Sequence, residues 1–146
     1  MPFLNAAILS VCDESGKWML VRPLYYRSAA GELIVIPAGF LTDLASIPRA
    51  FHWLIPVNGK HRAPAILHDY LFVVQDRSRA DVDALFLEAM TDAGVRWTQR
   101  TAMYAAVRLG GWAPWQHNAR ARAAASSEFL ASHGLVTVHT SARASG

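Results

Sequence analysis

The sequence predicts a single α+β domain in which antiparallel strands come first and helices follow. Short apolar runs separated by turn sequences fill the first forty residues, whereas apolar residues recur at helical spacing from residue 63 onward. A chain of 146 residues, 53% of them hydrophobic, has the size and composition to bury one core without a disulfide framework, which its single cysteine excludes. We therefore expect one compact domain over residues 1–115.

Three strands, joined as an antiparallel meander, are predicted before residue 40. The run 6–11 is apolar and ends at a turn sequence, and the run 18–26 is rich in aromatic and β-branched residues. The third run, 33–36, ends at Pro37, because proline has no amide hydrogen to donate within a sheet.

Two helices that form a hairpin are predicted next. Apolar residues recur at helical spacing over 63–74 and again over 79–93, and Asp76 lies in the short turn between the two runs. Ser78 is placed to cap the second helix, with Asp81 three residues later as a variant of the capping box.

A third helix is predicted from a cap at Thr98 to the glycine pair that starts at Gly110. Beyond it the chain becomes rich in Ala, Ser and Arg. We therefore expect residues 116–146 to form a tail that becomes ordered on a partner, either another protein or a second copy of the chain.

The net charge of +3 indicates little about a partner. Most of the excess lies in the predicted tail, where Arg120, Arg122 and Arg143 outnumber Glu128. A nucleic-acid-binding domain usually carries its excess on one folded face, so we do not expect nucleic acid as a partner. The chain also lacks the long apolar run of a transmembrane segment, and its first residues lack the pattern of a signal peptide.

Within the predicted hairpin, His68 and Asp83 are candidate catalytic residues. His68 lies eight residues before Asp76 and Asp83 lies seven after it, so a rise of ~1.5 Å per residue puts the two at nearly the same height. Each adjoins an apolar position, so both side chains can reach the seam between the helices. A carboxylate that binds one imidazole nitrogen orients the ring as a general base for water.

Asp69 and Asp43 are the candidate metal ligands. Asp69 follows His68 and therefore points about 100° further round the helix. Asp43 lies in an irregular stretch, 38–46, that can add oxygen ligands. We expect calcium first, with zinc or manganese as alternatives, and no organic cofactor.

Three sequence blocks together resemble a phage and prophage family catalogued as domain of unknown function 1353. The blocks are FLTDLASIPR at 40–49, AILHDYLF at 65–72 and SRADVDALF at 78–86. The resemblance implies a tailed phage or an integrated prophage as the source, and no established activity. It also implies synthesis in the host bacterial cytoplasm, with incorporation into the virion if the protein is structural.

The hairpin also resembles that of the secreted and parvoviral phospholipases A2. That resemblance implies that His68 activates water, Asp69 binds calcium and Asp83 orients the imidazole. The chain departs from the pattern at Phe72, where that family has a tyrosine, and it has neither their full glycine-rich calcium loop nor their disulfides.

A third interpretation takes His68-Asp69 as the metal-binding doublet of HD phosphohydrolases, with His52 or His61 as the upstream histidine. The predicted domain is small for that all-helical fold.

The leading hypothesis is therefore a phage-encoded, metal-assisted hydrolase of cell-envelope material, either a lipid ester or peptidoglycan. The alternative is a non-catalytic tail or baseplate component in which the same polar residues hold the hairpin together and Asp83 pairs with Arg79. A cytosolic protein that contacts host factors or nucleic acid comes third.

Overall fold

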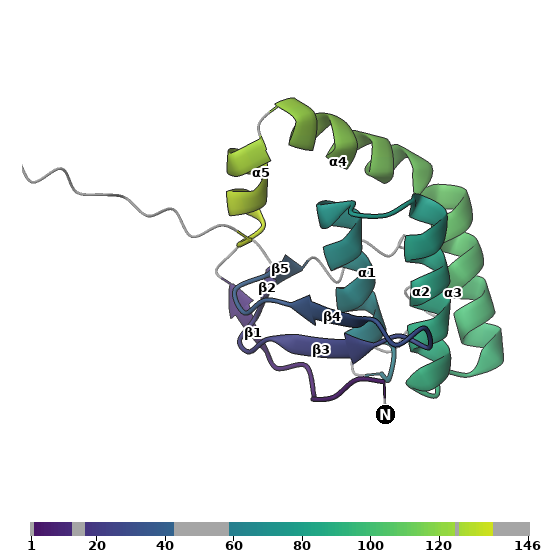
Figure 1. Cartoon of the computed structure of the whole chain (residues 1–146). Coiled ribbons are helices and arrows are strands. Elements are labelled where there is room, and N and C mark those ends of the chain that lie inside the picture. The colour runs from purple at the N-terminus through teal and green to yellow at the C-terminus, as the bar shows by residue number, and fades with distance from the viewer. Residues whose placement is uncertain (1, 13–16, 43–58, 125, 136–146) are drawn as a thin grey trace, which may run out of the picture.

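Strands precede helices in this chain, which confirms the α+β class. The structure is a computed structural model that describes residues 2–12, 17–42, 59–124 and 126–135. In chain order (Figure 1) its elements are β1 (Leu9–Cys12), β2 (Lys17–Leu20), β3 (Leu24–Arg27), β4 (Leu33–Ile36), β5 (Leu41–Thr42), α1 (Arg62–Val74), α2 (Arg79–Asp92), α3 (Trp97–Gly110), α4 (Trp112–Ala124) and α5 (Ser126–Ser132).

The described strands form two small antiparallel sheets rather than one three-stranded meander. One sheet has the order β1-β2-β5, and the other is the β3-β4 hairpin. The predicted strand 18–26 is divided, because β2 ends at Leu20 and β3 begins at Leu24, directly after Pro23. Proline cannot donate to a ladder, so the chain changes sheets at this point.

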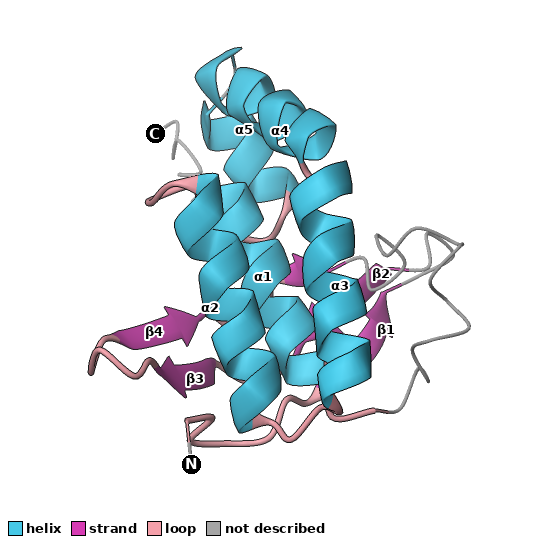
Figure 2. Cartoon of the chain, turned by 90° about the vertical axis from the view of Figure 1, so that its right-hand side faces the viewer, coloured by secondary structure: helices cyan, strands magenta, loops and turns pink. Residues whose placement is uncertain are grey.

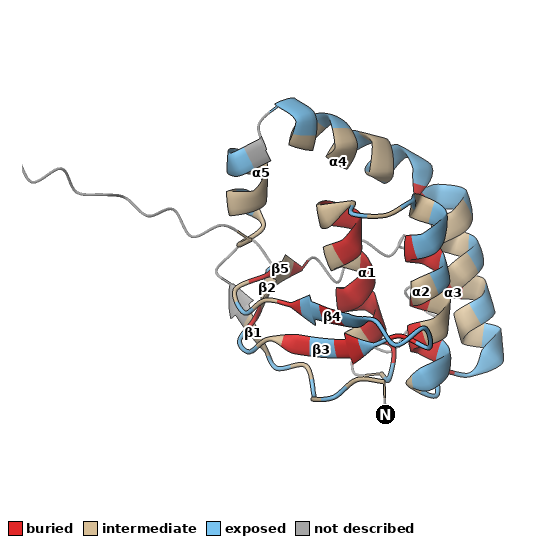
Figure 3. Cartoon of the chain, viewed as in Figure 1, coloured by how far each residue is buried: buried red, intermediate tan, exposed pale blue. Residues whose placement is uncertain are grey.

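Helix α1 lies at the centre of the molecule, between the strands on one side and α2 on the other (Figures 1 and 3). Side chains alternate along β3 and β4, so that one face of the hairpin is buried and the other is exposed. The buried face packs with α1 in a core cluster that includes Leu24, Tyr26, Ile36, Leu67 and Leu71. Because α1 is covered on most sides, a polar side chain on it is destabilising unless it has a hydrogen-bond partner.

The turn between α1 and α2 follows the sequence signals closely. The C-cap of α1 is Gln75, which adopts the left-handed conformation with φ of 51°. Ser78 is the N-cap of α2, as predicted: its Oγ accepts a hydrogen bond from the amide of Asp81 at 3.2 Å. Arg77 holds the turn against the β3-β4 turn through paired hydrogen bonds to Glu32 at 2.9 and 3.0 Å.

Helix α3 begins two residues earlier than predicted. Its N-cap is Arg96, and Thr98 lies inside the first turn, where its side chain does not cap the helix. Thr98 therefore has the residue type of a cap without the position of one.

Residues 112–124 and 126–132, most of which the sequence assigns to a tail, form α4 and α5 and cross one end of the bundle (Figure 2). The side chain of Gln75 donates to the carbonyl of Trp115 at 3.0 Å, and Asn118 donates to the carbonyl of Phe72 at 3.3 Å. The amide of Leu41 donates to the carbonyl of His133 at 3.1 Å. The described part of this segment therefore packs against the core domain. Among the described residues, no helix is both long enough and apolar enough to cross a bilayer.

We predict that Ser78→Ala destabilises the fold by about 1 kcal/mol, because the first turn of α2 loses its cap. Thr98→Ala is the matched control and is expected to change the free energy of unfolding by less than about 0.5 kcal/mol. Urea unfolding followed by circular dichroism measures both. Equal losses in the two variants would contradict the assigned helix starts.

Candidate functional site

His68 and Asp83 meet in the seam between α1 and α2. Nε2 of His68 lies 2.9 Å from Oδ1 of Asp83, which is hydrogen-bonding distance. Both residues are buried, and Asp83 is completely inaccessible to solvent. The hairpin therefore brings together His68 and Asp83, as predicted from their similar distances from the turn.

Two arginines complete the surroundings of the Asp83 carboxylate. Its second oxygen, Oδ2, accepts from Nη1 of Arg108 at 3.0 Å and from Nη1 of Arg79 at 3.4 Å. Arg79 also donates to the carbonyls of Val107 and Arg108 in the last turn of α3, both at 3.2 Å. One carboxylate thus links α1, α2 and α3, with donors from all three helices.

These contacts keep Asp83 ionised. Burial by itself raises the pKa of the carboxyl group, but the hydrogen bonds from His68 and Arg108 and the charge of Arg79 together hold the pKa below its ordinary value. A carboxylate only accepts hydrogen bonds, so Nε2 of His68 must carry the proton and donate it. In the neutral ring Nδ1 is then the free base.

The imidazole of His68 is held by aromatic rings as well as by Asp83. The centroids of Phe72 and Phe86 each lie 4.7 Å from the centroid of the imidazole. The His68 side chain remains 10% exposed. Among the described residues, Nε of Arg62 is the one fully buried side-chain donor or acceptor without a partner. The described residues provide no hydrogen bond to Nδ1 of His68.

Asp69 lies on a different side of α1 from His68, toward β5. Its Oδ2 accepts from Oγ1 of Thr42 at 2.6 Å. Asp43, the second predicted metal ligand, lies outside the described residues, as does His52. Within the ranges that are described, no three His, Cys, Asp or Glu side chains come together in a group that could hold a metal ion.

Two contributors to this site, Arg108 and Thr42, were not found by sequence reasoning. Arg108 is a cation in the last turn of α3, a position typical of charge–dipole stabilisation, so the residue alone does not indicate a buried partner. Thr42 has the residue type of an ordinary strand position. Arg79 was recognised as a partner of Asp83 from its spacing of four residues, and the structure places it there.

Gly111 allows the helices to approach at this site. A Cβ atom at this position would clash with the carbonyl of Val107 and would lie 3.3 Å from the ring of Phe72 and 3.4 Å from Nη1 of Arg79. In the sequence, Gly111 indicates only a helix end. Its close packing beside Arg79 is not visible there.

Comparison with known proteins gives a family match. The family model described as "Protein of unknown function (DUF1353)" matches residues 18–107, which is more than half of the chain. The matched range contains His68, Asp69, Arg79 and Asp83 but ends just before Arg108. Neither the curated proteins nor the solved structures contain a match.

We predict that Asp83→Asn destabilises the fold by about 3 kcal/mol, the lower end of the range for breaking a buried ion pair, because both arginines are partly exposed. Since the pKa of Asp83 is lowered in the folded chain, its stabilisation is complete above the unfolded-state pKa and is lost as the pH falls through the folded-state value. Urea unfolding across the acidic range therefore should show the difference between wild type and variant shrinking as the pH falls.

The control is Glu128→Gln on α5, which removes an exposed carboxylate and is expected to change stability by less than about 0.5 kcal/mol at any pH. A gap between wild type and Asp83→Asn that stays constant at low pH would contradict an ionised Asp83.

Proposed function

We propose that this chain, which belongs to the DUF1353 family of proteins of unknown function, is a hydrolase in which His68 activates water and Asp83 orients the imidazole. One observation carries the proposal: Nε2 of His68 lies 2.9 Å from a carboxylate that two arginines keep ionised. That contact selects the tautomer with a basic Nδ1.

The chemistry follows from this tautomer. An attacking water loses a proton to Nδ1 as it adds to an ester or amide carbonyl, and the resulting imidazolium is stabilised by the charge of Asp83. The proton can then pass from Nδ1 to the leaving group. The phenyl rings of Phe72 and Phe86 fix the plane of the imidazole, so the ring does not have to be ordered during the reaction.

We include in this proposal a divalent cation, calcium first, at Asp69. The carboxylate of Asp69 points away from His68 toward β5, so the proton-transfer group and the cation ligand occupy separate directions on α1. Asp69 is the one proposed ligand within the described residues. A cation held there would polarise the carbonyl under attack when the substrate spans from Nδ1 of His68 to Asp69.

The proposed substrate is cell-envelope material, either a lipid ester or peptidoglycan, and the proposed source is a tailed phage or a prophage. The source rests on the resemblance of the three sequence blocks, and the substrate follows from that source. A phage hydrolase meets the envelope at entry and at release, which is why we place the substrate there.

A second candidate function, a non-catalytic virion component, is favoured by a different observation. Asp83 accepts from three side chains and is fully buried, as expected for a clamp that holds three helices together. Leu109 and Trp112, on either side of the α3–α4 junction, are exposed apolar residues suited to contact a neighbouring protein.

We predict that the purified chain hydrolyses either fluorogenic phospholipid esters or dye-labelled sacculi and that His68→Ala lowers the rate by about 10²–10⁴-fold, the usual contribution of a general base. His117→Ala, which removes an exposed histidine of α4, should leave the rate unchanged. A chain that is inactive on both substrates over a range of pH and calcium concentrations would support the virion function.

A further prediction concerns the cation. Asp69→Asn should raise the calcium concentration needed for half-maximal rate by about tenfold or more, because the site loses a charged ligand. The chelator-treated wild-type chain should be inactive and should recover with calcium. An unchanged calcium dependence in the variant would remove Asp69 from the proposed cation site.

A further inference from the structure

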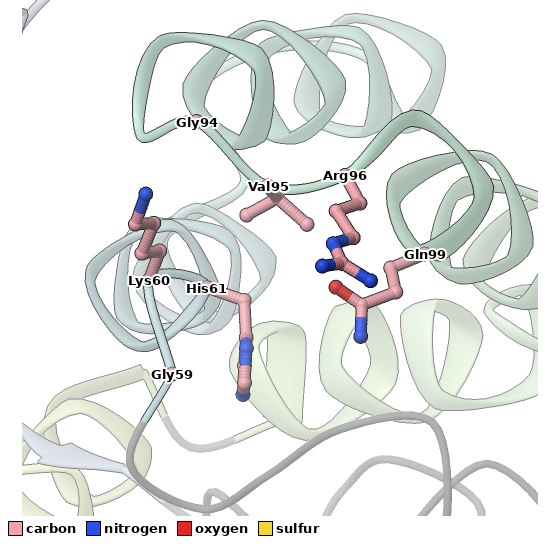
Figure 4. A pocket seen from close by; sticks show the side chains of 7 residues that line it. All are labelled: Gly59, Lys60, His61, Gly94, Val95, Arg96 and Gln99. Atoms are coloured by element: carbon pink, nitrogen blue, oxygen red, sulfur yellow. The ribbon is translucent and has the colours of Figure 1, made fainter.

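A pocket distinct from the His68 site lies where α1 and α3 begin. It has a volume of about 180 Å³ and is lined by Gly59, Lys60, His61, Gly94, Val95, Arg96 and Gln99 (Figure 4). The volume exceeds what one water molecule needs and falls short of the ~300–1,000 Å³ typical of drug-sized ligands. The pocket therefore suits a small group.

His61 is the buried polar side chain of this pocket. The residue is only 8% exposed, and its imidazole makes no hydrogen bond with any described residue. Figure 4 shows the ring on one wall, across the hollow from the side chains of Arg96 and Gln99. A buried imidazole without a partner leaves a donor available to a ligand.

Two cations add to this donor. Lys60 and Arg96 both line the pocket, and no carboxylate among the described residues pairs with either. The amine of Lys60 lies beside Gly94, where an added Cβ would be 3.6 Å from Nζ. The pocket thus combines an ammonium group with the forked donors of a guanidinium.

The helix starts point to the same ligand charge. Neither α1, with N-cap His61, nor α3, with N-cap Arg96, has a side-chain cap or an acidic residue in its first turn. Such ends carry partial positive charge. At the C-terminal end of α2, the carbonyls of Met90 and Thr91 already accept hydrogen bonds from the amides of Val95 and Gly94.

From these observations we propose that the pocket between the starts of α1 and α3 binds a phosphate group, held by Arg96, Lys60 and His61. Phosphate offers several acceptor oxygens in a tetrahedral arrangement, which matches donors that approach from two helix ends. Burial lowers the pKa of His61, so the imidazole is mainly neutral at pH 7 and donates a single hydrogen bond. The proposed phosphate site does not depend on hydrolysis at His68, which lies about 10 Å further along α1 than His61.

The test is calorimetric titration of the full chain with inorganic phosphate, and separately with glycerol 3-phosphate, with ionic strength matched by chloride. We expect saturable binding that Arg96→Gln weakens by about tenfold, the loss of one charge-assisted hydrogen bond. Lys60→Gln should weaken it in the same direction, and Arg120→Gln, on an exposed arginine of α4, should not. Tighter binding of glycerol 3-phosphate indicates a phosphate attached to a larger molecule, and equal binding indicates the free ion.

The absence of saturable binding at tens of millimolar phosphate would overturn the proposal. Equal weakening by Arg96→Gln and Arg120→Gln would also overturn it, because the effect would then be one of net charge. Acetate that binds more tightly than phosphate would show a carboxylate site instead.

Discussion

The buried carboxylate of Asp83 is the constraint on which the helical half of the molecule depends. An ionised carboxylate away from water costs several kcal/mol unless charged donors surround it. Here the donors come from His68 on α1, Arg79 on α2 and Arg108 on α3. The spacing and rotation of three helices are therefore set at one point, and Gly111 permits the close approach that this spacing requires.

The same constraint determines what His68 can do. Because Asp83 takes the proton of Nε2, only Nδ1 remains as a base, and the flanking phenyl rings prevent the imidazole from turning. A catalytic dyad and a structural clamp would share this arrangement. A dyad requires that a substrate reaches Nδ1 of His68 and Asp69, whereas a clamp does not. The geometry is compatible with both functions, and an activity measurement distinguishes them.

Sequence reasoning found the pairing of His68 with Asp83, because counting residues outward from a short turn places two helical positions at one height. It did not find Arg108, because the rotation of α3 against α2 is a tertiary property that no local pattern encodes. Helix α4 also escaped prediction, since none of its residues is buried and so it shows no apolar period. The side chain of Asp69 points in a different direction from that of His68, because successive residues of a helix are rotated by about 100°.

The most direct test of the central claim is the tautomer of His68, read from the ring-nitrogen chemical shifts of the isotope-labelled chain. With Asp83 ionised, neutral His68 should carry its proton on Nε2, and Asp83→Asn should relax that preference while His117 remains unaffected. A neutral His68 protonated on Nδ1 in the wild-type chain would contradict the account, because Asp83 would then not be an ionised acceptor for the ring.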